Sequence, residues 1–224
     1  AHRTTYDPST GQKVFDSLNA TAPPGFEGSP KVWTEVCRKY KAQIEVFAKG
    51  AILPAQDIIN IEHRFSLMHF IRLCYNSCFV PNGREHLWAL GLNEGMKGNY
   101  GVAVSILTPQ FEHLVRDVLR SFGVQTRIIQ DDGTEDEKSL NALISEPALV
   151  EKFGDGIVFE MRLLLCDSQG VNLRNRVAHG LIDDSVNWSL QAVYFWWFTL
   201  RLTLIPILLA TLPNQEDEPN DQQS

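Results

Sequence analysis

The sequence is poor in cysteine, with only Cys37, Cys74, Cys78 and Cys166 in 224 residues. Four cysteines in a chain of this length do not form a small disulfide-stabilised scaffold. Cys74 and Cys78 lie four residues apart on an expected helix, but a structural zinc site needs four ligands. No second pair with finger-like spacing follows them. We therefore expect buried thiols in a reducing cytoplasm, and neither a metal ion nor another cofactor.

Positive charge is also scarce, since 20 Lys and Arg residues face 27 Asp and Glu residues, for a net charge of −7. A protein that coats nucleic acid is basic, so any contact with RNA here must be confined to a local patch. The sequence shows no signal peptide. Because it begins with alanine and not with methionine, we expect that further domains or partner proteins are absent from this chain.

An alternating strand pattern of useful length is absent, and apolar residues recur at helical spacing instead. The clearest amphipathic stretch covers residues 102–122, in which we expect Pro109 to kink the helix or to restart it after Thr108. Gly123 is suited to end it. The fold class that follows is an all-α helical bundle. Its expected core includes Leu114, Leu119, Leu163, Leu164, Phe195 and Phe198.

Composition divides the chain into four parts. Residues 1–30 are rich in Pro, Gly, Ser and Thr and read as a loosely ordered arm. Residues 31–80 form N-terminal helices, residues 81–212 form the main helical domain, and residues 213–224 form an acidic tail that we expect to be disordered.

Several boundaries inside these parts rest on single residues. We expect Gly50 and Pro54 to stop the first helix and Asp57 to cap the second, which continues to Phe79. Residues 130–139 read as an acidic loop. We expect a final helix to begin at Trp188, with a cap from one of two residues, Ser185 or Asn187.

The apolar stretch from Ala192 to Leu212 is long enough to span a bilayer. Arg201 near its middle costs roughly 3 kcal/mol on the insertion scale, and the neighbouring apolar residues offset this by about 3–7 kcal/mol. A bundle also needs a central apolar helix, so we favour a buried core or dimer helix and expect no membrane contact. Three tryptophans in and before this stretch are expected to be packing residues: Trp188, Trp196 and Trp197.

The stretch "VNLRNRVAHGL" places Arg174, Asn175, Arg176 and His179 within six positions. On a helix Asn175 and His179 share a face, whereas Arg174 lies about 140° around from His179. Arginine recognises phosphate oxygens, and histidine transfers protons near neutral pH. The set therefore suits cleavage of RNA through its 2′-OH. The alternative is a structural role, in which these side chains cap carbonyls or pair with Asp167, Asp183 or Asp184.

The segment "RNRVAH" resembles the R-x4-H motif of the HEPN (higher eukaryote and prokaryote nucleotide-binding) superfamily. Together with "PNGRE", "LTPQFEHLVR" and "FGDGIVFEMRLLLCDSQG", in this order, it resembles an uncharacterised branch of that superfamily. The branch occurs in bacterial multidomain proteins, some linked to phage defence. The same set of segments also resembles a eukaryotic endoplasmic-reticulum-membrane-associated RNA degradation protein. The resemblance covers roughly residues 81–212.

This resemblance implies a HEPN-like helical bundle that acts as a metal-independent endoribonuclease in a homodimer, in antiviral defence or as a toxin. Arg174 and His179 take the catalytic positions, and Asn175 orients them. The substrate-binding and supporting residues are then Arg176, Gln110, Glu112 and Arg116. For the last three, a solvated polar helix face is the alternative. The other reading of the whole domain is a dimer that does not cut but binds RNA, a nucleotide or a partner protein.

Overall fold

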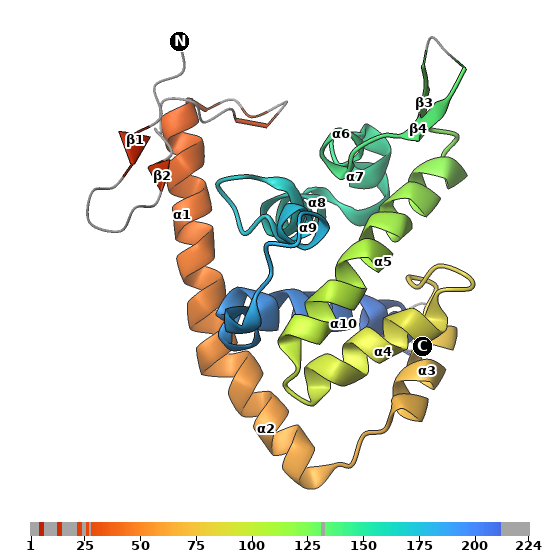
Figure 1. Cartoon of the computed structure of the whole chain (residues 1–224). Helices are drawn as coiled ribbons and strands as arrows, with labels where there is room; N and C mark the ends of the chain where they lie inside the picture. The colour runs from red at the N-terminus through yellow and green to blue at the C-terminus, as the bar shows by residue number, and fades with distance from the viewer. Residues whose placement is uncertain are drawn as a thin grey trace, which may run out of the picture.

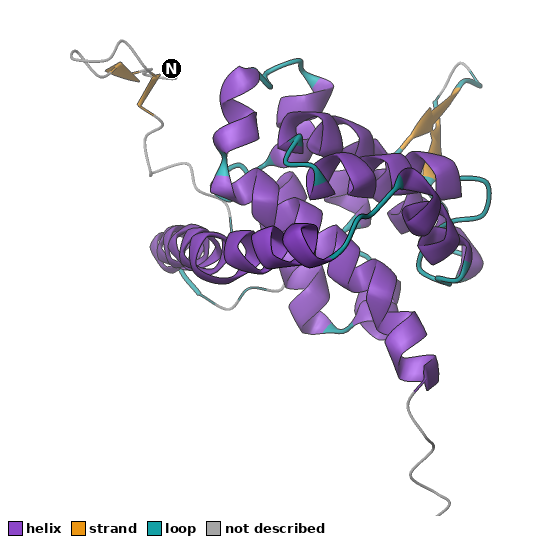
Figure 2. Cartoon of the chain, turned by 90° about the horizontal axis from the view of Figure 1, so that it is seen from below, coloured by secondary structure: helices purple, strands orange, loops and turns teal. Residues whose placement is uncertain are grey.

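The computed structural model describes residues 5–6, 13–14, 22–23, 26, 28–130 and 133–211. Its body consists almost entirely of helices, from which two short hairpins stand out (Figure 2). The predicted all-α class is therefore confirmed. The expected N-terminal arm lies mostly, and the expected acidic tail wholly, outside the described residues. Within the arm, β1 (Thr5–Tyr6) pairs antiparallel with β2 (Lys13–Val14).

The chain enters the body through one long helical run, which Figure 1 shows along one edge of the molecule. It consists of α1 (Pro30–Phe47), the π-helical turn η2 (Ala48–Ile52) and α2 (Leu53–Glu62). The first α-helix ends at Phe47, shortly before Gly50, as predicted. Gly50 and Pro54 do not interrupt the helical run, however, and the prediction that Asp57 caps the second helix is wrong because Asp57 lies inside α2. In the π turn, the Leu53 amide donates to the Ala48 carbonyl, five residues back. Pro54 therefore falls in the first turn of α2, directly after the π turn.

The next three helices form one side of the bundle: α3 (Leu67–Tyr75), α4 (Glu85–Met96) and α5 (Tyr100–Ser121). The helix predicted from Asp57 to Phe79 is thus broken into two, and Ser66 with His69 forms a capping box at the start of α3. α5 continues through Pro109, so the predicted restart after Thr108 is not found. Fully buried Leu107 and Phe111 anchor α5 in the core on both sides of the proline.

A second hairpin follows α5 and consists of β3 (Arg127–Ile129) and β4 (Glu135–Glu137). It occupies part of the predicted acidic loop, which is a correction. Acidic side chains of β4 pair with arginines: Arg127 lies 2.8 Å from Glu135 and 3.2 Å from Glu137. A segment rich in Asp and Glu is typical of a loop. The arginine partners that stabilise it as a strand cannot be recognised from the local sequence.

Short helices then lead to the last long one. They are α6 (Leu140–Leu143), α7 (Pro147–Phe153), α8 (Asp155–Met161), the π turn η3 (Arg162–Cys166), α9 (Leu173–Ala178) and the 3-10 turn η4 (Asp184–Trp188). α10 covers Leu190–Thr211. It begins after η4, so neither Ser185 nor Asn187 caps it at Trp188 as predicted. The Asn187 side chain instead accepts a hydrogen bond, 2.7 Å long, from the Gly101 amide in the first turn of α5.

The core lies where α4, α5 and α10 meet (Figure 1). Trp88, Phe111 and Phe198 stack in its centre and are fully buried. The six core residues expected from the sequence are all buried, and the core also includes Phe70 and Cys74 from the N-terminal helices. Trp196 is buried as expected, but Trp188 is 87% exposed, so its assignment as a packing residue is wrong. Cys78 is exposed, unlike the other three cysteines.

α10 is the one helix of the described residues that is long and apolar enough to cross a membrane. Half of its most apolar window is buried against the rest of the protein. Its N-terminal part packs on α1, α4 and α5, while Leu208 and Leu209 near its end are exposed.

Candidate functional site

The arginine–histidine motif lies on α9, a helix of six residues that follows a tightly fixed loop. The loop docks on η3, since the Val171 amide donates to the Leu163 carbonyl at 2.8 Å. A Cβ on Gly170 would lie 2.2 Å from that same oxygen, so only glycine allows this approach. Asn172, with φ +57°, makes the left-handed turn into α9. Asparagine tolerates this conformation better than most residues.

Arg174, in the first turn of α9, pairs with Glu112 in the middle of α5. Its Nε donates to Glu112 Oε2 at 2.8 Å and its Nη2 donates to Oε1 at 3.2 Å. The two side chains are 27% and 13% exposed. The structure therefore places Arg174 in a half-buried two-point contact with the helix that forms the centre of the bundle.

Asn175 also contacts Arg174, by accepting a hydrogen bond of 3.2 Å from Nη1. Its amide nitrogen donates to the Asn172 side-chain oxygen at 2.8 Å. The asparagine thus bridges the turn before α9 and the guanidinium, which fixes the orientation of Arg174 from a second side.

Arg116 completes the cluster one turn further along α5. It approaches Glu112 at 2.5 Å and Glu137 of β4 at 3.1 Å, and it donates to the Lys138 carbonyl at 3.1 Å. Two carboxylates and two guanidinium groups therefore alternate from the hairpin to α9. This network holds the β3–β4 hairpin and α9 on the same face of α5.

The charges of this network shift the pKa of Glu112. Burial of its carboxylate opposes ionisation, but hydrogen bonds and charge from Arg174 and Arg116 outweigh burial and lower the pKa below its ordinary value. The hydrogen bonds from Arg174 to Glu112 likewise raise the arginine pKa. Both groups are charged at neutral pH, so part of the positive charge of Arg174 is already compensated.

His179 stands at the other end of α9, as the residue that caps its C-terminus. Its backbone amide donates to the Asn175 carbonyl at 3.0 Å, and Gly180, with φ +65°, turns the chain away. The imidazole is exposed. Among the described residues, no hydrogen bond or ion pair joins it to Arg174 or Arg176. We expected Asn175 and His179 to share one face of a helix. α9 ends at Ala178, so only the backbone hydrogen bond between these two residues continues the helical pattern as far as His179.

Arg176 lies between these ends and is half-buried. The pKa of Asp183 is lowered by hydrogen bonds from Ser185 and, to a smaller extent, by the charge of Arg176. The acidic neighbours considered as partners for the motif have other contacts. Asp167 accepts the Trp33 indole N–H at 2.9 Å, and Asp183 accepts hydrogen bonds from Ser185.

Gln110 takes no direct part in this cluster. It is buried, and its side-chain oxygen accepts a hydrogen bond of 3.3 Å from Arg84 Nη1 at the start of α4. His113 is close to the same arginine, and its pKa is lowered by burial and then by the charge of Arg84. Of the three residues singled out on α5, Glu112 and Arg116 contact the Arg174 network directly and Gln110 does not.

Two members of the cluster were missed by the sequence reasoning, Glu137 and Asn172. Glu137 approaches only because the hairpin folds back on α5, and no local spacing indicates this. Asn172 carries a usable signal, because an asparagine shortly after a glycine and directly before a helix is typical of a left-handed turn. Among the described residues, no group of three or more His, Cys, Asp or Glu side chains is placed to hold a metal ion.

Comparison of the chain with protein-family models, with curated protein sequences and with solved structures gives no match.

Proposed function

We propose that this domain is a HEPN-type, metal-independent endoribonuclease that works as a homodimer. The observation that carries the proposal is the arrangement on α9. Glu112 and Asn175 fix the Arg174 guanidinium at one end of the helix, and the other end presents His179 to solvent. The resemblance of "RNRVAH" to the R-x4-H motif assigns these two residues the catalytic positions.

The length of α9 supports the dimer. Helical rise separates residues 174 and 179 by roughly 7–8 Å along the axis, so one chain holds its arginine and its histidine apart. The reaction benefits from a proton acceptor and a proton donor, and one motif supplies a single histidine. Two copies of α9 that meet across a two-fold axis bring two histidines and two arginines to one phosphodiester.

The proposed chemistry needs only groups of the protein and the RNA. One His179 takes the proton from the 2′-OH, the 2′-oxygen attacks phosphorus, and the bond to the 5′-oxygen breaks. The second His179 gives a proton to that leaving oxygen. Arg174, with Arg176, stabilises the negative charge that accumulates on the phosphate oxygens. The products are a 2′,3′-cyclic phosphate and a 5′-hydroxyl.

The second candidate is a dimer of the same kind that does not cut but binds RNA, a nucleotide or a partner protein. The Arg174–Glu112 pair favours this reading, because a carboxylate that holds an arginine in two hydrogen bonds also competes with phosphate for it. A binding role requires only the half-buried guanidinium of Arg176 and the exposed imidazole of His179.

Incubation of the purified chain with total RNA in EDTA tests the proposal. Wild-type protein should release ends that carry 2′,3′-cyclic phosphate, and DNA of the same sequence should stay intact because it lacks the nucleophile. His179→Ala should slow cleavage about 100-fold or more, the usual scale for a lost general acid or base. His63→Ala is the matched control, since His63 is also an exposed histidine at the end of a helix.

Wild-type protein that never cuts RNA, alone or within a longer protein, would contradict the nuclease. A His179→Ala variant that cuts as fast as wild type would do the same. RNA binding without cleavage, lost in Arg176→Ala, would favour the second candidate.

A further inference from the structure

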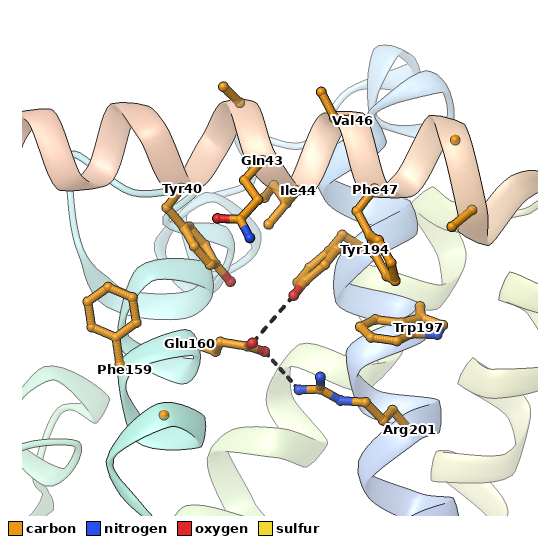
Figure 3. A pocket seen from close by; sticks show the side chains of 14 residues that line it. Tyr40, Gln43, Ile44, Val46, Phe47, Phe159, Glu160, Tyr194, Trp197 and Arg201 are labelled. Carbon is orange, nitrogen blue, oxygen red and sulfur yellow. Dashed lines mark hydrogen bonds and ion pairs between the residues drawn. The ribbon is translucent and has the colours of Figure 1, made fainter.

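A pocket lined by aromatic rings lies between α1, α8 and α10 and contains none of the motif residues. Its volume is about 930 Å³, within the range of pockets that hold small molecules. Figure 3 shows that Tyr40 of α1, Glu160 of α8, and Tyr194 and Arg201 of α10 point toward one polar centre. Five aromatic residues form much of the wall: Tyr40, Phe47, Phe159, Tyr194 and Trp197.

The polar centre is an ion pair between Glu160 of α8 and Arg201 of α10. Arg201 Nη2 lies 2.9 Å from Glu160 Oε2, and the guanidinium lies 4.7 Å from the centre of the Trp197 ring. Burial raises the pKa of Glu160, and the charge of Arg201 counteracts this. Two opposite charges thus meet in a pocket whose wall is mainly aromatic and aliphatic, and their sum is close to zero.

Hydrogen bonding at this centre is incomplete. Among the described residues, Glu160 Oε1 has one hydrogen-bond partner, the Tyr194 hydroxyl, at a long 3.4 Å. Arg201 Nε is buried and, within the described part of the chain, makes no hydrogen bond of standard geometry, whereas the buried Tyr40 hydroxyl has the Tyr194 hydroxyl as its neighbour. The Arg201 and Glu160 side chains are 32% and 22% exposed, so Glu160 Oε1 and the guanidinium nitrogen that the ion pair leaves free are groups to which a ligand can bind.

We infer that this pocket binds a flat, neutral heteroaromatic ring that presents a hydrogen-bond acceptor next to N–H donors. Guanine fits the groups best. Its O6 matches an Arg201 donor, and its two adjacent donors, on N1 and N2, match the Glu160 carboxylate. The aromatic walls pack against the ring faces or edges. The inference is independent of the nuclease proposal, because it uses no residue of the motif.

A cationic ligand fits the same pocket less well. Aromatic walls with a carboxylate are typical of sites for quaternary ammonium groups. Here, however, Arg201 already occupies the Trp197 face and neutralises Glu160, so a second cation would be repelled. A purely aliphatic ligand would shield the Glu160–Arg201 pair from water without offering it a hydrogen bond.

Two glycines in the wall allow the pocket to be filled without damage to the core. A Cβ on Gly50 of η2 or on Gly156 of α8 would meet no atom within 4 Å. Gly156 is exposed, lies in a helix and does not have a positive φ, so larger residues are compatible with its backbone. Gly156→Leu therefore adds bulk inside the pocket, and Gly156→Ala controls for the change in helix propensity.

Titration calorimetry of the full chain with guanosine, adenosine and choline tests the inference, with thermal unfolding to verify that each variant is folded. Guanosine should bind about tenfold more tightly than adenosine, because adenine offers one hydrogen bond fewer to the Glu160–Arg201 pair. Choline should not bind. Gly156→Leu should abolish guanosine binding, Gly156→Ala should retain it, and Glu160→Gln should weaken it about tenfold or more.

A guanosine-containing oligoribonucleotide distinguishes a free nucleoside from a base within RNA. Loss of guanosine binding or of oligonucleotide binding in Gly156→Leu supports the inference. The ligand whose binding is lost shows whether the ring comes from a free nucleoside or from a base within RNA. Guanosine binding that survives in a folded Gly156→Leu variant overturns it, as does choline binding tighter than that of guanosine. Failure of both guanosine and the oligonucleotide to bind wild-type protein also overturns it.

Discussion

Arg174 on α9 and Glu112 on α5 form a two-point ion pair, with distances of 2.8 Å and 3.2 Å, across 62 residues of sequence. Both side chains are less than one third exposed. Solvent therefore screens this pair less than it screens the ion pairs on the β3–β4 hairpin. The pair connects the motif helix to the centre of the bundle, and its loss affects both stability and the position of Arg174.

Glu112→Gln removes the carboxylate charge and keeps the size of the side chain. We expect a loss of about 1–3 kcal/mol in the free energy of unfolding, because Arg174 and Arg116 are both left partly buried with less compensation. Glu135→Gln is the control, since the Arg127–Glu135 pair is more than half exposed and should contribute no more than about 0.5 kcal/mol. Urea unfolding of both variants measures the difference. Equal losses in the two would show that the ion pairs of Glu112 with Arg174 and Arg116 are together no stronger than a surface pair.

The lowered pKa of Glu112 predicts a dependence of stability on pH. Because its pKa is lower in the folded chain than its ordinary value of 4.5, the ionised carboxylate stabilises the fold above that pH. This contribution decreases as the pH falls through the folded pKa. Unfolding measured between about pH 7 and about pH 3 should therefore show a difference between wild type and Glu112→Gln that shrinks with acidification. A difference that stays constant over this range would contradict the assigned shift.

Gly95 on α4 is a position at which any side chain collides with the core. A Cβ there would lie 2.0 Å from Trp196 Cδ1, and the indole is held by a 2.9 Å hydrogen bond to the Leu92 carbonyl. Gly95→Ala should destabilise the protein by about 1–3 kcal/mol, the usual cost of overpacking. Gly50→Ala meets no atom and should be neutral or slightly stabilising. Thermal unfolding that is unchanged in Gly95→Ala would contradict the packing of Trp196.

Thiol reactivity should distinguish Cys78 from the other cysteines. Burial raises the pKa of Cys37, Cys74 and Cys166 to about 12 each, whereas Cys78 is exposed. A thiol reagent near pH 8 should therefore modify one thiol per native chain and all four in denaturant. Cys78→Ser should abolish the native reaction. Rapid modification of a second thiol without denaturant would show that one of the buried sites opens.

The sequence predicted the buried face of α5 because a stripe of apolar residues at helical spacing leaves one choice of interior. It failed at Pro54, since the effect of a proline depends on the hydrogen-bond register that reaches it, and a π turn changed that register. It failed at Trp188 because side-chain type alone does not say which face of a turn meets the core. Ser185 and Asn187 were misassigned as caps of α10 because η4 precedes that helix.

The sequence predicted which residues belong to the candidate site better than it predicted the contacts between them. The motif spacing pointed to Arg174 and Asn175. The resemblance of the segment that contains Glu112 and Arg116 pointed to these two residues as supporting groups. The ion pairs that join them depend on how α9 and the hairpin pack on α5, which periodicity does not reveal. Glu137, which contacts Arg116 from the hairpin, therefore had no counterpart in the prediction.

The segment from Arg174 to Asn187 is attached to α5 at two points, through Glu112 in the middle of that helix and through the Gly101 amide in its first turn. His179 lies in the span between the two attachments. In native-state hydrogen exchange, the amides of α9 and of η4 should therefore open together with the start of α5, as one cooperative unit. Asn187→Ala should release one attachment and speed exchange at Gly101 and along α9, while amides in the middle of α10 stay protected.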